Sequence, residues 1–223
     1  MKRQLDPLGA NWSFFDAWRH APPGLPVGRM IDRELTQGEL GCFSSHYVAW
    51  QWFVEQSEAD QLVILEDDTV LDPDFFLAID EWTHALEQVD MVRLYGQKFR
   101  RWSRLRRIRN KRLVRYFEAP TGTQAYILTR RGAMRLLRSI KRIERPIDDE
   151  LNRFWAHGVL PMALFPYPVI ECCGPSSATM GDRRRGQMTP GVALQYHAHR
   201  LAEDLRRLAC NIRLAVTQHR LSD

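Results

Sequence analysis

The strongest constraint on the fold is a short apolar run that ends in three consecutive acids, within residues 61–74. Residues 62–65 are apolar without alternation and are compatible with β-structure, a pattern typical of a strand buried on both faces. Asp72 and Pro73 then provide the N-cap and the first residue of a helix. Ligands of open α/β sheets bind beyond the carboxyl ends of the strands, so we expect a ligand site at the intervening acids.

The three acids are Glu66, Asp67 and Asp68, and their carboxylates would repel one another unless a cation lay between them. A hard divalent metal with oxygen ligands, Mn²⁺ or Mg²⁺, is the cation that this chemistry favours. The alternative is that the acids are solvated loop residues that stabilise the start of the following helix.

The surrounding chain alternates strand and helix patterns, which indicates an α/β fold. Thr36 and Glu39 form a capping box, and the apolar periodicity after them predicts a helix to about Ser57. Pro161 places an expected strand at a sheet edge, because proline lacks the amide donor that an interior strand needs. The further strands are expected at residues 12–18, 91–95, 113–117, 125–128 and 159–165, and further helices after Asp72, Thr129 and Pro146.

The 223 residues allow one domain with a sizeable core, which we expect to span residues 1–190. Residues 191–223 are expected to form an amphipathic helix, because apolar side chains repeat at steps of four and three from Leu194 to Ala215. That stripe predicts packing on the domain, with self-association as the second interpretation. No segment has the apolar length of a membrane span or of a secretory signal, so a cytoplasmic location is expected.

Positive charge is concentrated from Arg100 to Arg115, which holds nine Lys and Arg residues and no acid. Without this segment the chain's net charge of +5 would be negative, so the basicity is local. The interleaved Trp102, Leu105 and Ile108 favour the surface of an anionic membrane as its partner. The alternative is a solvated loop, and no nucleic-acid motif accompanies the basic run to indicate nucleic acid as a partner.

Several segments together resemble glycosyltransferase family 25, which includes lipooligosaccharide and collagen galactosyltransferases. Residues 35–46 read LTQGELGCFSSH, and residues 63–68 read VILEDD. Residues 123–137, TQAYILTRRGAMRLL, and residues 146–148, PID, are similar to later blocks of the family in the same order. The resemblance covers roughly residues 35–151.

The resemblance implies a GT-A-like mixed sheet flanked by helices, a UDP-sugar donor, typically UDP-galactose, a divalent metal, and inversion at the anomeric carbon. Asp68 matches the likeliest direct ligand of the metal, with Glu66 beside it. Glu66 and Asp67 would also contact the donor, and so would a Ser-His pair. That pair is Ser45 and His46, although a histidine on an amphipathic helix is also commonly a hydrogen-bonded residue at the core boundary.

Asp148 matches an acid suited to act as the general base, and Asp149 and Glu150 are its close rivals. A position in the first turn of a helix suits an exposed, ionised carboxylate. The alternative is that all three acids only complement the helix dipole.

The front of the chain departs from the family pattern. Members normally begin with an apolar strand and a basic turn that help to hold the nucleotide, whereas residues 1–3 here look like the segment after that strand. Either the start is misplaced or the domain is truncated. A sheet without its first strand is expected to expose an edge in its nucleotide half and to bind UDP weakly.

Two functional hypotheses follow. The first is an inverting, metal-dependent hexosyltransferase that adds a sugar, galactose by resemblance, to a lipooligosaccharide or lipopolysaccharide acceptor at the inner face of the inner membrane. The second is a catalytically inactive family member that binds a membrane or a protein partner through its basic segment.

Overall fold

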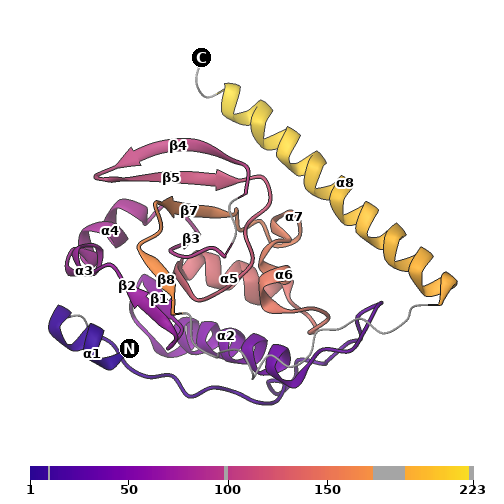
Figure 1. The fold of residues 1–223 in the computed structure, drawn as a ribbon, viewed down its shortest axis with the longest axis horizontal. Helices are drawn as coiled ribbons and strands as arrows, with labels where there is room; N and C mark the ends of the chain where they lie inside the picture. The colour runs from indigo at the N-terminus through magenta and orange to yellow at the C-terminus, as the bar shows by residue number, and fades with distance from the viewer. Residues whose placement is uncertain (10, 98–99, 173–188, 221–223) are drawn as a thin grey trace.

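The structure is a computed structural model that describes residues 1–9, 11–97, 100–172 and 189–220, with side chains to residue 217. The fold is built on a six-stranded sheet of order β1-β6-β3-β7-β5-β4 (Figure 1). Its strands are β1 Gln61–Leu65, β3 Met91–Arg93, β4 Trp102–Ile108, β5 Lys111–Tyr116, β6 Ala125–Thr129 and β7 Met162–Phe165. The pair β3–β7 is parallel and the other pairs are antiparallel, which confirms the α/β class with a mixed sheet. A second sheet pairs β2 Thr69–Leu71 with β8 Val169–Glu171.

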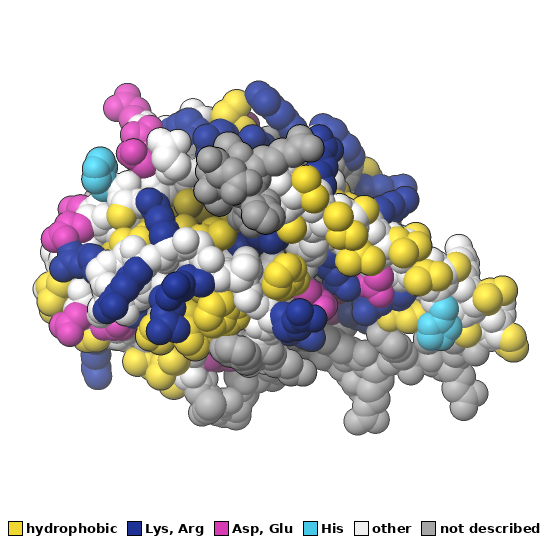
Figure 2. Space-filling model, turned by 90° about the horizontal axis from the view of Figure 1, so that it is seen from above, with side chains coloured by type: hydrophobic (Ala, Val, Ile, Leu, Met, Phe, Trp, Pro, Cys, Tyr) yellow, Lys and Arg dark blue, Asp and Glu magenta, His cyan; other side chains and the backbone are white. Residues whose placement is uncertain are grey.

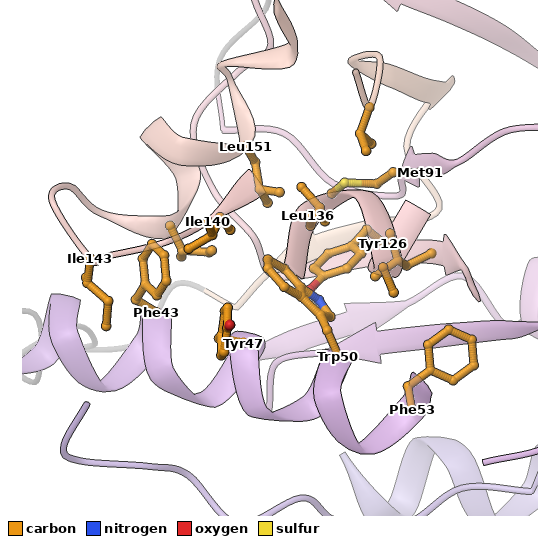
Figure 3. Packing of buried hydrophobic residues seen from close by; sticks show 14 of the residues in the cluster. Phe43, Tyr47, Trp50, Phe53, Met91, Tyr126, Leu136, Ile140, Ile143 and Leu151 are labelled. Atoms are coloured by element: carbon orange, nitrogen blue, oxygen red, sulfur yellow. The ribbon is translucent and has the colours of Figure 1, made fainter. Parts of the chain in front are cut away.

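Helices cover both faces of the sheet. They are α1 Lys2–Leu5, α2 Gln37–Gln56, α3 Pro73–Leu77, α4 Ile79–Leu86, α5 Arg130–Ser139, α6 Ile147–Leu151, α7 Phe154–His157 and α8 Pro190–Arg220, with a 3₁₀ turn at Asp6–Leu8. Successive residues of β6 point to opposite faces, so Tyr126 joins an apolar cluster with α2 and α5, whereas Ile127 joins another with α3 and α4. Figure 3 shows the first cluster, in which Trp50 from α2 lies against Tyr126, and Phe43 from the same helix lies beside Ile140.

The predicted helix starts are confirmed because they depend on local contacts. The hydroxyl of Thr36 accepts a hydrogen bond from the amide of Glu39 at 3.1 Å, and the Glu39 carboxylate accepts one from the amide of Thr36 at 2.9 Å. The side chains of Asp72 and Thr129 cap α3 and α5 by accepting a hydrogen bond from the amides of Phe75 and Gly132. The helix after Asp72 is, however, divided at Ala78 into α3 and α4.

Three strand predictions were wrong in part. Residues 12–18 form neither strand nor helix, and the front of the chain instead contains the short helix α1. Strand β1 is not buried on both faces but half-buried at the end of the sheet, because β6 is its one partner among the described residues. Strand β7 lies inside the sheet between β3 and β5 and not at an edge, since Pro161 precedes the strand and removes no ladder donor from it.

The basic stretch is an ordered hairpin, β4–β5, and not a loop. Two of its cations are buried and partnered: Lys111 pairs with Asp72 at 3.2 Å, and Arg115 donates to Asn211 of α8 at 2.8 Å. The predicted C-terminal helix is present as α8. Its apolar stripe does not pack on the domain, because Leu194, Leu201, Leu205, Leu208 and Ile212 are all more than half exposed. Among the described residues, no helix has the length and apolarity needed to cross a membrane.

Candidate active site

A broad cleft of about 2240 Å³ is lined by the N-terminal segment, by β1 and by one side of α2. One wall is the free edge of β1, and the opposite wall includes residues 11–19. Most of the side chains that the sequence predicted as site residues line this cleft. They are Ser45, His46, Glu66, Asp67, Asp68 and Asp148, whereas Asp149 and Glu150, the rival candidates for the base, do not line it.

The acids occupy the turn between β1 and β2, and backbone contacts hold that turn on both sides. The amide of Glu66 donates to the carbonyl of Gln124 at 2.7 Å, and the amide of Cys172 donates to the carbonyl of Asp68 at 2.7 Å. The hydroxyl of Thr69 donates to the carbonyl of Glu66 at 2.8 Å. The turn is therefore fixed by β6 on one side and by the end of β8 on the other.

Glu66 is held by a buried polar network. Its Oε1 atom accepts from the Thr123 hydroxyl at 2.9 Å and lies 3.5 Å from Nε2 of His46. Nδ1 of His46 lies 2.8 Å from the hydroxyl of Tyr126, which also accepts from Trp50 at 2.9 Å. His46 is thus both the core-boundary residue of the alternative interpretation and a neighbour of the acids.

The network favours the charged forms of its two titratable partners. Burial alone would lower the pKa of His46, but Tyr126, Cys42 and Glu66 raise that pKa well above its ordinary value. Burial alone would raise the pKa of Glu66, but the hydrogen bond and charge of His46, with Thr123, lower it. The two therefore form an imidazolium–carboxylate pair at the base of the cleft.

Asp68 is the acid whose surroundings best indicate a ligand site. Its Oδ1 atom is buried without a hydrogen-bond partner among the described residues. Burial raises the pKa of Asp68, and the carboxylates of Glu66 and Glu171 raise it further. A divalent cation would relieve this repulsion and occupy the unpartnered oxygen, so the residues present fit such a metal.

Glu171 is a site residue that the sequence reasoning missed. It stands opposite Thr69 in the β2–β8 pair, and the Tyr95 hydroxyl donates to its Oε2 atom at 2.6 Å. The apolar pair before Glu171 is a weak strand signal, and the prolines and glycine in the sequence around it favour a loop instead. With Asp68, Glu171 offers a second carboxylate for a metal, although Tyr95 and Gln124 already donate to its two oxygens, as Thr123 does to Oε1 of Glu66. A direct role of Glu66 at the metal stays a prediction.

A second set of potential ligands is Cys42, His46 and Glu66, whose ligand atoms lie within 4.8 Å of one another. Such a mixed set suits zinc. Both nitrogens of His46 already have partners in Tyr126 and Glu66, so a metal here would have to displace the network.

The three acids of α6 have different surroundings. Asp148 is half-buried at the cleft, and its charge acts on the fully buried guanidinium of Arg93, one nitrogen of which has no hydrogen-bond partner among the described residues. Asp149 is exposed away from the cleft. Glu150 is buried in ion pairs with Arg145 and Arg153. Of the three, Asp148 is the one placed to meet a ligand.

Ser45 of α2 connects that helix to the N-terminal segment. Its hydroxyl accepts from the amide of Trp18 at 2.9 Å and donates to the carbonyl of Gly41 at 2.8 Å. These bonds hold residues 11–19 against α2. The predicted contact of Ser45 with the UDP-sugar stays a prediction.

The architecture is that of an α/β protein with an acid-lined ligand cleft at the end of a strand. The model of the family described as glycosyltransferase family 25 (LPS biosynthesis protein) matches residues 26–151. The chain belongs to this family, which confirms the resemblance seen in the sequence.

Similar proteins have related descriptions. Lipooligosaccharide biosynthesis protein lic2B of Haemophilus influenzae is 28% identical over 152 residues, which are 61% of this chain and 56% of that protein. A glycosyltransferase 25 family member of Drosophila pseudoobscura pseudoobscura is 28% identical over 72% of this chain and 29% of its own length. Procollagen galactosyltransferase 1 of Danio rerio is 33% identical over 53% of this chain and 20% of its own length. The chain thus spans about half, or less, of these relatives.

Proposed function

We propose that the protein is an inverting glycosyltransferase with a GT-A-like nucleotide-binding half. It transfers a hexose, galactose, from a UDP-sugar to a hydroxyl of a lipooligosaccharide or lipopolysaccharide glycan. The observation that carries the proposal is the unpartnered buried oxygen of Asp68, beside Glu171, in a cleft that also contains Asp148. Membership of family 25 supports the reaction class, and the descriptions of the bacterial and zebrafish relatives support the acceptor and the sugar.

The chemistry divides between two groups of acids that line the cleft. Asp68 and Glu171 hold a divalent cation, Mn²⁺ or Mg²⁺, which supplies positive charge for the departing diphosphate. The pair of His46 and Glu66 fixes the turn that carries Asp68. Asp148 accepts the proton of the acceptor hydroxyl as that oxygen attacks the anomeric carbon, and attack opposite the diphosphate inverts the configuration.

The test is to measure binding of UDP by calorimetry, with and without Mn²⁺, together with transfer of galactose. Asp68→Asn should abolish both transfer and the Mn²⁺-dependent part of binding, while its thermal midpoint stays the same or rises because repulsion among the acids is relieved. The control is Asp74→Asn, which removes an exposed acid of α3 outside the cleft and should change neither quantity. Metal-dependent binding that survives in Asp68→Asn would refute the assignment.

The second candidate is a catalytically inactive family member that binds a membrane or a protein. The observation in its favour is the free edge of β1, which leaves the wall of the cleft half-exposed in the described residues. It predicts no binding of UDP at millimolar Mn²⁺ and no transfer by the unmodified protein.

The proposed acceptor is a membrane glycolipid, so we place the protein at the cytoplasmic face of the inner membrane. The exposed arginines of the β4–β5 hairpin are the proposed contact with anionic lipid there.

A further inference from the structure

Helix α8 presents a polar face to the domain and an apolar face to solvent, the reverse of an ordinary surface helix. The less exposed positions combine polar side chains with smaller apolar ones: Val192, Ala193, Tyr196, His199, Ala202, Glu203, Arg207, Cys210, Asn211 and Leu214. The exposed apolar positions are Leu194, Leu201, Leu205, Leu208, Ile212 and Val216. At 3.6 residues per turn these two sets lie on opposite sides of the helix.

Specific polar contacts fix this orientation. Glu203 pairs with Arg145 at 3.3 Å and with Arg153 at 3.1 Å, near the middle of the helix. Further along, Asn211 accepts from Arg115 at 2.8 Å and donates to the carbonyl of Phe117 at 3.0 Å. The opposite face of α8 is thus attached to the domain at two places. These attachments turn the apolar face outward.

The outward side chains form one continuous row of large apolar groups, each from 50% to 73% exposed. Exposed apolar patches of this extent mark surfaces that contact a partner or a membrane. Exposed arginines at 200, 206 and 213 border the row. The two acids of this region are engaged, Glu203 with the domain and Asp204 with Arg207 at 2.5 Å.

The same side of the molecule carries the basic hairpin. Figure 2 shows the apolar row along α8 and the Lys and Arg side chains over the hairpin facing the same direction. The exposed cations of the hairpin are Arg101, Arg104, Arg106, Arg107, Arg109 and Arg112. Within the described residues the side chains of Arg104 and Arg112 make no hydrogen bond or ion pair, so their charges are available to an external anion.

We propose that the apolar row of α8 and the hairpin arginines together form a surface that docks on an anionic phospholipid bilayer, with α8 lying in the interface. The row would enter the boundary between headgroups and acyl chains, and the arginines would contact the phosphates. A second copy of α8 is the competing occupant. It would cover a narrow seam and leave the hairpin free, and it would bring arginines of both copies together, whereas an anionic bilayer covers and neutralises both parts.

The test uses the full chain and vesicles of phosphatidylcholine with or without phosphatidylglycerol, and measures binding by co-sedimentation. The unmodified protein should bind the anionic vesicles and should be released by salt. Replacing Leu201, Leu205 and Leu208 by Ser should weaken binding by at least about tenfold, because the apolar area is lost. These positions are exposed, so circular dichroism should show the fold unchanged.

The charge contribution has its own matched pair of variants. Arg104→Gln with Arg112→Gln should weaken binding to anionic vesicles, whereas Arg138→Gln with Lys141→Gln removes the same charge at and beyond the end of α5 and should leave binding nearly unchanged. Equal binding to neutral and anionic vesicles would overturn the proposal. The proposal would also be overturned if the protein bound no vesicles and formed a dimer that the triple Ser variant dissociates. That result would assign the apolar row to contact with a second copy. Vesicle binding needs no donor sugar, so its failure would leave the proposed transfer reaction untouched.

Discussion

Lowering the pH from 7 to 5 is expected to destabilise the protein through one buried histidine, His157. Its Nδ1 atom accepts from the amide of Val159 at 3.1 Å, so the proton of the neutral ring is on Nε2, 3.3 Å from the carbonyl of Glu150. Protonating Nδ1 would break the first bond and leave a charge in the core. Burial, with a smaller effect of Arg153, therefore lowers the pKa of His157 from 6.5 to about 4.

The size of the effect follows from this pKa. The folded state holds the proton less tightly than the unfolded state, so the stabilisation is present above pH 6.5 and is lost as the pH falls towards 4. Linkage over this window gives a loss of about 2 kcal/mol between pH 7 and pH 5. For a chain of this size that loss alone would lower the thermal midpoint by roughly 5 °C, and His46, whose pKa is raised in the folded state, contributes in the opposite direction.

The assay is urea unfolding followed by tryptophan fluorescence at several pH values between 5 and 7. His157→Gln should be less stable than the unmodified protein at pH 7, and most of the difference should disappear at pH 5. His84→Gln, in which an exposed histidine is replaced, should keep the full pH dependence. A parallel pH dependence in the unmodified protein and in His157→Gln would refute the reasoning.

Three further variants test other contacts. Glu203→Gln should lower the free energy of unfolding by about 2 kcal/mol, because two largely buried arginines lose a charged partner. Asp204→Asn, on the exposed side, should lower it by less than about 0.5 kcal/mol. Equal losses in urea unfolding would contradict this. Asp148→Asn should lower turnover roughly 10²–10⁴-fold with little change in donor affinity, and Asp149→Asn should not; the reverse result in steady-state kinetics would move the base to Asp149. Glu171→Gln should weaken Mn²⁺-dependent UDP binding in calorimetry, and unchanged binding would remove Glu171 from the metal site.

Local signals were predictable from the sequence because they depend on neighbours along the chain. The capping box of Thr36 and Glu39 and the cap at Thr129 each need residues within three positions, and the structure contains them. The acids of residues 66–68 were found for the same reason, since a strand pattern ends directly before them.

Features that depend on long-range pairing were not predictable in this way. Strand β7 was assigned to an edge from its proline, but its place is set by β3 and β5, which come from distant parts of the chain. The heptad pattern of α8 gave the helix correctly and its orientation incorrectly. The orientation depends on ion pairs of Glu203 with residues some fifty positions away. The spacing of apolar residues within the helix gives no information on such pairs.

The β2–β8 pair determines when the site can be assembled. Asp68 emerges early in synthesis, but Glu171, opposite Thr69, is about a hundred residues later. Until that pairing forms, the turn of the acids lacks its backbone bond from Cys172 and its second carboxylate. In the proposed metal site, affinity for the cation should therefore appear only after β8 has paired with β2, which requires the closure of a long loop. Substitutions that loosen β8 should therefore impair metal binding well before they unfold the core.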